Sequence, residues 1–138
     1  MDNPIVVFTN GCFDGFHEGH KYLLNFAKTL GDKLVVAVNL DEDVQRLKGK
    51  NRPIFNIVTR LKKIKEFDPS IRIYVFNGES ELEHLISFVH PDILVKGEDW
   101  KGKYIVGAKH IASYGGMIMF APHLKGISTT NLIKNGKL

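Results

Sequence analysis

The sequence predicts an α/β fold, in which five parallel strands form one doubly wound sheet with helices on both faces. Short apolar runs of strand length alternate along the chain with longer segments whose apolar residues recur at helical spacing. The strand-length runs are continuously apolar, as in residues 33–39 (KLVVAVN), which is typical of buried parallel strands. Ligands bind such sheets beyond the carboxyl ends of the strands, so we expect functional residues directly after strands.

The first predicted strand covers residues 4–9 (PIVVFT), where β-branched residues are frequent. A glycine-rich turn follows, and apolar side chains at helical spacing then predict a helix over residues 17–30. Gly31 ends this helix, and residues 33–39 form the second strand. The first three elements therefore read as strand, helix and strand, the repeating unit of a parallel sheet.

The middle of the chain continues the alternation after an interruption. Residues 40–55 are polar and basic, and we expect a loop there. Helical spacing returns over residues 57–67, a third strand is expected at 71–76, and a third helix at 79–89.

The last part of the chain supplies two further strands. Residues 92–96 (DILVK) form the fourth, and a polar loop over 97–103 follows it. Residues 104–114 have helical spacing, and 117–121 form the fifth strand. A hydroxyl-rich start at Ser128 predicts a short final helix through Lys134. We see no repeat or linker, so residues 1–138 are predicted to form a single domain.

Composition excludes several classes of protein. Hydrophobic residues make up 43% of the chain and charged residues 25%, as in an ordinary folded domain. The apolar runs fall far short of the ~20 residues that a membrane span needs. The one cysteine rules out an intrachain disulfide and a multi-cysteine zinc site. With no secretory signal in view, we expect a cytoplasmic location and no membrane partner.

The positive charge is concentrated in one segment. The net charge is +4, yet residues 46–65 hold eight of the 19 basic residues and no Asp or Glu. Such a field favours an anionic partner, phosphate or nucleic acid. For Lys62, Lys63 and Lys65, a solvated helix face is the plainer interpretation. No helix-turn-helix or basic motif interleaved with aromatic residues is present, so a nucleic-acid-binding module is a remote alternative and no nucleic-acid partner is expected.

The segment after the first strand, residues 10–20 (NGCFDGFHEGH), carries the main functional signal. Its glycines let the backbone approach a ligand, and the helix start offers free N–H groups to an anion. His17 and His20, three residues apart, share one helix face, so both imidazoles can reach phosphate oxygens. Helix capping or surface filling by the pair, and a metal pair lacking an evident third ligand, are the alternatives.

This segment resembles the HxGH signature of the cytidylyltransferase-like nucleotidyltransferases. The resemblance extends over nearly the whole chain through the segments TNGCFD, VNLD, RLKGKNRP, PDILVKGEDW and STTNLIK. These look most like the nucleotidyltransferase domain of bifunctional heptose kinase/adenylyltransferases. The implied fold is Rossmann-like, of the HUP or nucleotidylyltransferase type. The implied reaction moves a nucleotidyl group from a nucleoside triphosphate, by this resemblance ATP, to D-glycero-β-D-manno-heptose 1-phosphate and releases pyrophosphate.

A second relative keeps the substrate open. Residues 98–103 (EDWKGK) and 126–130 (GISTT) also resemble glycerol-3-phosphate cytidylyltransferase, which would use CTP. His123 and Leu124 depart from that subfamily, which argues against cytidine. Both resemblances imply Mg²⁺ bound mainly through the triphosphate, with no protein metal ligand named. Partners would be a nucleoside triphosphate, a sugar or polyol phosphate and, as in relatives, a second copy of the chain.

The resemblance also implies residue roles. The catalytic residues, which would contact the reacting phosphates, are His17, His20, Lys48, Ser128 and Thr129. Nucleotide contacts are expected from Thr9, Asn10, Gly11, Cys12, Phe13, Asp14, Gly19, Lys96, Gly97, Asp99 and Thr130. Arg52 and Arg60 would face a substrate phosphate. For Asp14, ordering of the loop is the alternative to ligand contact. For Ser128 to Thr130 the alternative is simple helix capping.

Overall fold

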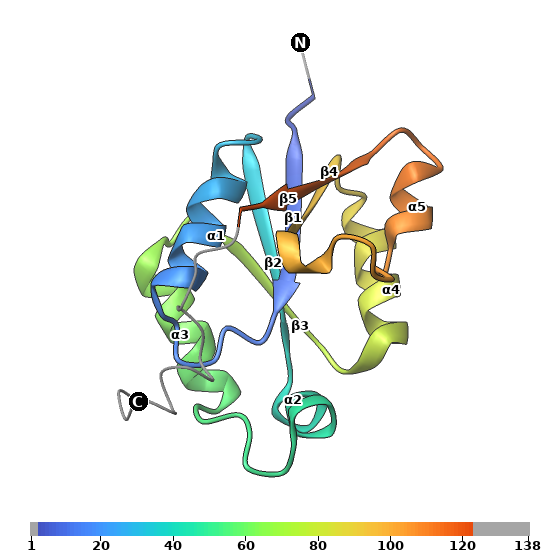
Figure 1. The fold of residues 1–138 in the computed structure, drawn as a ribbon. Coiled ribbons are helices and arrows are strands. Elements are labelled where there is room, and N and C mark those ends of the chain that lie inside the picture. Colours follow the sequence, from blue (N-terminus) through green and yellow to red (C-terminus); the bar gives the residue numbers. More distant parts are fainter. Residues whose placement is uncertain (1–2, 123–138) are drawn as a thin grey trace.

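Five parallel strands form one sheet, in the spatial order β3-β2-β1-β4-β5 (Figure 1). The structure is a computed structural model that describes residues 3–122. The strands are β1 (Val6–Gly11), β2 (Lys33–Asn39), β3 (Arg72–Phe76), β4 (Ile93–Gly97) and β5 (Met117–Ala121). The predicted fold class is confirmed, including the parallel pairing of every neighbouring strand pair.

Helices cover both faces of the sheet (Figure 1). The α-helices are α1 (Glu18–Lys28), α2 (Asp41–Lys48), α3 (Ile57–Phe67), α4 (Gly78–Val89) and α5 (Ala108–Ala112), and Glu98–Trp100 form a 3₁₀ turn, η1. α1 and α3 pack on one face, whereas α4 and α5 pack on the other. No helix within residues 3–122 is long and apolar enough to span a bilayer.

The core is divided into two layers by the alternation of strand side chains. On β4, Val95 packs into the layer under α1 and α3, and Leu94 packs into the layer under α4 and α5. On β1, Val7 and Phe8 divide in the same way. Phe8 is fully buried, and burial of such a side chain contributes about 1.5–3 kcal/mol. The position of a residue along its strand therefore determines which layer, and which side of the site, its side chain faces.

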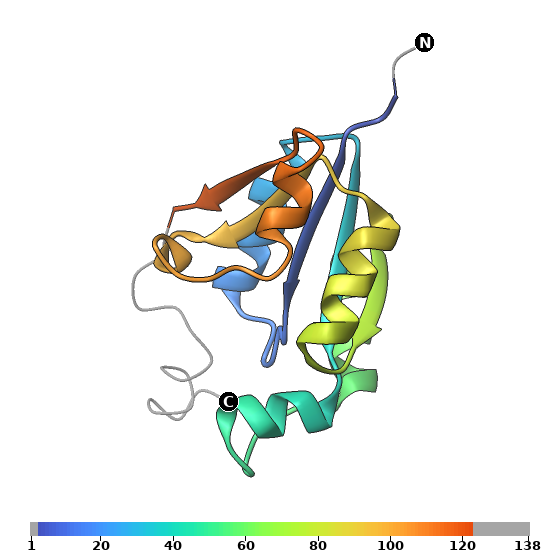
Figure 2. The same cartoon turned by 90° about the vertical axis from the view of Figure 1, so that its right-hand side faces the viewer.

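The structure corrects the predicted loop over residues 40–55, because its first part is the helix α2. Most of its side chains are polar, and only Asp43 and Val44 are buried, so no apolar periodicity is visible in the sequence. Acidic residues fill its first turn, and Arg46 and Lys48 its last, a distribution that complements the helix dipole. Figure 2 shows α2 lying beyond the carboxyl ends of the central strands.

Two other elements have bounds that differ from the predicted ones, and one predicted helix lies outside the described residues. β1 runs to Gly11 rather than ending at Thr9, so the motif begins within the strand. The helix predicted over 104–114 is confined to α5, because Gly107 has a φ of 88°, a left-handed conformation that starts the helix there. The predicted final helix over 128–134 is not among the described residues.

Candidate active site

The site lies where the chain diverges from the sheet. β1 is central, with β2 on one side and β4 on the other, so the connections leaving β1 and β4 pass to opposite faces. This reversal of strand order opens a crevice at the carboxyl ends of the two strands. The segment after β1 leads to α1, and the segment after β4 leads through η1 to α5. The predicted site residues come mainly from these two connections and from α2.

The β1–α1 turn is held by buried aromatic side chains. Phe13 and Phe16 are both buried, and both have positive φ, 52° and 31° respectively. This conformation is strained for side chains of this size, and their packing in the core offsets the strain. The ring centroids of Phe13 and His20 are 5.3 Å apart. The Phe13 side chain therefore supports the imidazole and is buried away from a nucleotide, which leaves its backbone as the possible contact.

His17 and His20 form a capping box at the start of α1. Nδ1 of His17 accepts a hydrogen bond from the backbone N–H of Gly19 at 3.1 Å. Nδ1 of His20 accepts one from the backbone N–H of His17 at 3.2 Å. Because a backbone N–H can only donate, both Nδ1 atoms are unprotonated. In a neutral imidazole the proton then lies on Nε2, which leaves one N–H donor on each ring.

The two imidazoles are stacked and uncharged. Their ring centroids are 3.8 Å apart, with an angle of 15° between the planes. Burial, with smaller contributions from His17 and Lys48, lowers the pKa of His20 to about 3. Burial also lowers the pKa of His17, although Glu18 opposes the shift. At neutral pH both rings are thus neutral Nε2–H donors, and Lys48 is close enough to act on both.

The capping alternative and the phosphate alternative are therefore compatible. Capping uses Nδ1 of each ring, whereas a phosphate would use Nε2. Residues 3–122 contain no group of three or more His, Cys, Asp or Glu side chains that could hold a metal ion. His17 and His20 thus have both a structural and a potential catalytic function.

Asp14 organises the connection between α2 and α3. Its carboxylate is fully buried and accepts hydrogen bonds from the backbone N–H groups of Ile54, at 2.7 Å, and Phe55, at 2.9 Å. Nε of Arg52 lies 3.4 Å from the same carboxylate. Of the two interpretations of Asp14, this geometry favours loop ordering over nucleotide contact. Within the described residues, Nη2 of Arg52 is buried and has no hydrogen-bond partner, so one donor of Arg52 stays available to an anion.

The prediction that Arg60 faces a substrate phosphate requires correction. Its side chain is fully buried, and all three guanidinium nitrogens donate to protein oxygens. Nη1 bonds the carbonyl of Cys12 at 3.0 Å, Nη2 bonds Asp41 at 2.6 Å, and Nε bonds the carbonyl of Phe55 at 2.9 Å. Arg60 therefore joins the β1–α1 turn to both ends of the segment that carries Lys48. Its function is to position this segment.

Thr9 also has a structural position. Its side chain is fully buried, and its hydroxyl donates to the carbonyl of Val95 at 2.9 Å. This bond ties β1 to β4 just below the divergence of the strands. The hydroxyl is thus engaged within the sheet, and we correct the expectation that it contacts the nucleotide.

The end of β4 brings together three predicted residues. A Cβ on Gly97 would lie 2.8 Å from Oδ1 of Asp99, so the glycine allows the Asp99 carboxylate to fold back over the strand end. Asp99 acts on Lys96 electrostatically, but burial dominates and lowers the pKa of Lys96 to about 8. Ser128, Thr129 and Thr130 lie outside the described residues.

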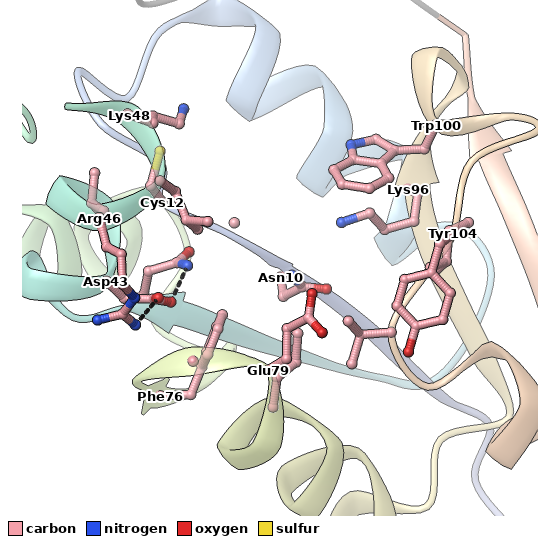
Figure 3. A pocket seen from close by; sticks show the side chains of 18 residues that line it. Asn10, Cys12, Asp43, Arg46, Lys48, Phe76, Glu79, Lys96, Trp100 and Tyr104 are labelled. Carbon is pink, nitrogen blue, oxygen red and sulfur yellow. Dashed lines mark hydrogen bonds and ion pairs between the residues drawn. The ribbon is translucent and has the colours of Figure 1, made fainter.

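A pocket of about 440 Å³ lies beside the histidine pair, on the α4 side of the sheet (Figure 3). Asn10, Gly11 and Cys12 line it from the end of β1, and Lys48 and Lys96 from α2 and β4. It also contains residues that the sequence did not single out for function, namely Arg46, Glu79, Trp100 and Tyr104. Arg46 is an exposed residue that also bonds Asp43 at 2.5 Å. The unpredicted helix α2 places it there.

Comparison with known proteins agrees with this architecture. A parallel sheet with a histidine pair opening the first helix at the switch point defines a domain of the nucleotidyltransferase class. A family model described as cytidylyltransferase-like matches residues 8–135, and the chain therefore belongs to the cytidylyltransferase-like family.

The chain is similar to curated bifunctional HldE proteins of several bacteria. The bifunctional protein HldE of Marinomonas sp. is 43% identical over 138 residues, 100% of this chain and 29% of the relative. The HldE of Haemophilus influenzae strain PittGG is 44% identical over 133 residues, 96% of this chain and 28% of the relative. The resemblance inferred from the motifs is thus confirmed. The chain spans less than a third of the length of these relatives.

Solved structures share the fold. A lipopolysaccharide core biosynthesis protein from Thermoplasma volcanium has a TM-score of 0.68 and 29% identity, covering 89% of this chain and 98% of its own. A pantoate-beta-alanine ligase from Francisella tularensis has a TM-score of 0.65 at 14% identity, covering 96% of this chain and 65% of its own. The second likeness concerns the fold alone.

Proposed function

We propose that the chain transfers a nucleotidyl group from ATP to D-glycero-β-D-manno-heptose 1-phosphate and releases pyrophosphate. The observation that carries the proposal is the pair of neutral imidazoles at the start of α1, each with Nδ1 bonded to backbone and with no hydrogen bond from Nε2–H to any atom of residues 3–122. The helix N-terminus adds its own affinity for anions. The relationship to HldE proteins supports this choice of donor and acceptor.

In the proposed reaction an anionic oxygen of the acceptor phosphate attacks the α-phosphorus of the triphosphate in line. A new P–O bond forms, and the bond from the α-phosphorus to the bridging oxygen breaks. The electron pair leaves with pyrophosphate. No proton has to be removed from the nucleophile, so the enzyme contributes positioning and stabilisation of charge.

Each site residue has a defined part in this scheme. Nε2–H of His17 and of His20 would donate to the α- and β-phosphate oxygens, where charge grows as pyrophosphate departs. Lys48 would neutralise charge beside them. The backbone of residues 10–13 and Gly19 would approach the phosphates closely, while Gly97 and Asp99 would contact the nucleoside. Ser128, Thr129 and Thr130 are proposed to donate to the β- and γ-phosphates, and Arg52 to a substrate phosphate.

Magnesium is proposed to enter with the triphosphate. Mg²⁺ keeps several waters and is bound largely through substrate phosphates in many nucleotide-using enzymes, so the ion would be held chiefly by phosphate oxygens and water. When bound, the ion would neutralise charge on the leaving pyrophosphate.

Pyrophosphate release tests the proposal. Purified chain with ATP, Mg²⁺ and heptose 1-phosphate is expected to release pyrophosphate and to form a product with the mass of ADP-heptose. His17→Ala and His20→Ala should each lower kcat by about 100-fold or more. His84→Ala, which removes an exposed histidine of α4, is the matched control and should leave kcat unchanged. Full activity in the doubly substituted chain (His17→Ala, His20→Ala) would refute the proposal.

The same assay separates the alternative substrates. Pyrophosphate release from CTP with glycerol 3-phosphate, and none from ATP with the heptose, would assign the chain to the second resemblance. A homodimer and a cytoplasmic location stay predictions, as does a single domain over residues 1–138. Sedimentation equilibrium would test the first of these.

A further inference from the structure

The helix α2 ends in Lys48, and few contacts hold this end of the helix directly. Asp43 and Val44 are the buried residues of α2, whereas Leu47 is 69% exposed. Within residues 3–122 the Lys48 ammonium forms no hydrogen bond or ion pair. The place of Lys48 therefore depends on how the earlier residues of α2 are anchored.

A buried carboxylate anchors α2 at the third residue of the helix. Asp43 is 3% exposed, and both of its carboxylate oxygens accept hydrogen bonds. Nδ2 of Asn39, at the end of β2, donates to Oδ2 of Asp43 at 2.8 Å. Nη2 of Arg46 donates to Oδ1 at 2.5 Å and forms an ion pair with the carboxylate. Burial of a carboxylate is costly unless it is paired and hydrogen-bonded, so these contacts restrict where Asp43 can lie.

Arg46 extends this connection from Asp43 to the start of α4. Its Nη2 also donates to Oδ1 of Asn77, the residue that precedes α4, at 3.0 Å. Nδ2 of Asn77 donates in turn to the carboxylate of Glu42, so two hydrogen bonds join Asn77 to α2. Figure 3 shows the Arg46 and Asp43 side chains joined, on the helix that carries Lys48. A continuous chain of hydrogen bonds thus runs from β2 through α2 to the start of α4.

The anchored helix brings the Lys48 ammonium close to the histidine pair. Burial is the main cause of the lowered pKa of His17 and of His20, and the positive charge of Lys48 lowers both further. Charges in salt solution act on one another only over about 10 Å, so the ammonium lies near both imidazoles. The chain of hydrogen bonds therefore supports a cation beside the proposed phosphate site.

We propose that Asp43 is a positioning residue for the transfer reaction. Its carboxylate, through Arg46 and Asn77, fixes the placement of α2 and so holds Lys48 beside the imidazoles. The inference rests on the proposed function, in which Lys48 neutralises charge on the triphosphate. A change at Asp43 should therefore act on the reaction through Lys48.

The pKa of His17 tests the positioning in the absence of substrate. Asp43→Asn keeps the size of the side chain, and the loss of a carboxylate would by itself lower the pKa of a nearby imidazole. Movement of the Lys48 ammonium away from the ring has the opposite sign and raises this pKa. Glu18 and His20, the other titratable groups that act on or stack against the ring, are the same in both chains.

Nuclear magnetic resonance titration of His17 makes this measurement. The pKa of His17 should be higher in Asp43→Asn than in the unmodified chain, and it should also rise in Lys48→Gln. An unchanged or lower pKa in Asp43→Asn, together with a rise in Lys48→Gln, would overturn the proposal.

A cycle of single and double substitutions tests the link to the reaction. Lys48→Gln is expected to lower kcat about 100-fold, and Asp43→Asn about 10-fold, measured by pyrophosphate release. If Asp43 acts through Lys48, the doubly substituted chain should be no slower than Lys48→Gln. A further tenfold loss in the doubly substituted chain would mean that Asp43 acts by another route, which would overturn the proposal.

Asp68→Asn is the matched control for the loss of a buried carboxylate. Asp68 is also buried and forms an ion pair, with Lys28, but it lies between α3 and the start of β3, at the edge of the sheet opposite the site. Its substitution should lower the Tm and leave kcat and the pKa of His17 unchanged.

Asn77→Ala provides a second test if Asp43→Asn does not fold. The side chain of Asn77 is uncharged and does not cap α4, so its removal breaks the connection to Arg46 without removing a charge or a helix cap. It should raise the pKa of His17 and lower kcat severalfold. If both stayed unchanged, the proposal would be overturned.

The positioning and the proposed reaction can fail separately. A chain that releases pyrophosphate, with the same kcat and the same His17 pKa in Asp43→Asn, would overturn the positioning and leave the proposed function standing. A chain that releases no pyrophosphate, but in which Asp43→Asn raises the pKa of His17, would support the positioning and refute the proposed reaction.

Discussion

Replacing His17 with asparagine separates the two functions that the structure gives this residue. Nδ1 of His17 caps α1 by accepting from Gly19 N at 3.1 Å, and Nε2–H is the proposed donor to the triphosphate. Asparagine is among the best N-cap residues, and its Oδ1 can accept the same hydrogen bond. It is too short to present a donor where Nε2–H lies. His17→Asn should therefore keep the helix start and lose the phosphate contact.

The expected magnitudes are different enough to be measured. Loss of a donor to the transferring group lowers kcat by about 100- to 1,000-fold. Loss of an N-cap costs about 1 kcal/mol, or roughly 3–4 °C in Tm for a chain of this size. His17→Asn should thus lose activity at nearly constant Tm, whereas His17→Ala should lose both.

Pyrophosphate release at saturating ATP and heptose 1-phosphate, with thermal denaturation of the same samples, makes the comparison. If His17→Asn keeps kcat within tenfold of the unmodified chain, the Nε2 donor is not needed and the reasoning is refuted. If its Tm falls as far as that of His17→Ala, the capping geometry is wrong.

Three further predictions follow from the site. Arg60→Met should lower the free energy of unfolding by about 2–4 kcal/mol, measured by urea denaturation, because two backbone carbonyls lose their hydrogen-bond donor. Asp41 is 43% exposed, so water replaces much of its lost ion pair. An unchanged midpoint would contradict the positioning role. The pKa of His20 is about 3 in the folded chain and 6.5 in the unfolded chain, so between these pH values only the unfolded chain binds the proton. The free energy of unfolding is therefore unaffected by His20 above pH 6.5. It falls by up to about 1.4 kcal/mol per pH unit as the pH drops from 6.5 toward 3. Urea denaturation of the unmodified chain and of His20→Gln, compared between pH 7 and pH 4, should show a steeper loss in the former. Gly97→Ala should raise the KM for ATP several-fold by displacing the Asp99 carboxylate, with little change in the KM for heptose 1-phosphate.

The central sheet could be predicted from sequence because its signals are local. Runs such as 33–39 contain consecutive β-branched residues, and a continuous apolar run of this kind is typical of a strand that is buried on both faces of a sheet. The histidine pair could be predicted because its spacing and its place after a strand both matter to the chemistry. The sequence could not predict that Nδ1 of each ring caps the helix and that the proton lies on Nε2. This depends on which backbone N–H group each ring contacts in the folded chain.

The residues that sequence reasoning misplaced depend on distant contacts. Arg60 occupies a helix position that reads as exposed, yet its partners are Cys12, Asp41 and Phe55, up to 48 residues away in the chain. α2 buries only Asp43 and Val44, and five of its residues line the pocket, so no apolar stripe marks this helix in the sequence. Glu79 and Tyr104 carried no signal, since a pocket wall assembled from separate elements leaves no pattern in any one of them.

The protonation of the histidine pair tests the central claim most directly. With ¹⁵N-labelled chain at pH 7, two-bond correlation spectra assign the proton of each imidazole to Nδ1 or Nε2, and the spectra of His17→Gln and His20→Gln identify the two rings. Both rings are expected to be neutral with the proton on Nε2, and both Nε2–H signals should shift when α,β-methylene-ATP and Mg²⁺ are added. A proton on Nδ1 of either ring, or signals that stay in place at saturating nucleotide, would contradict the account.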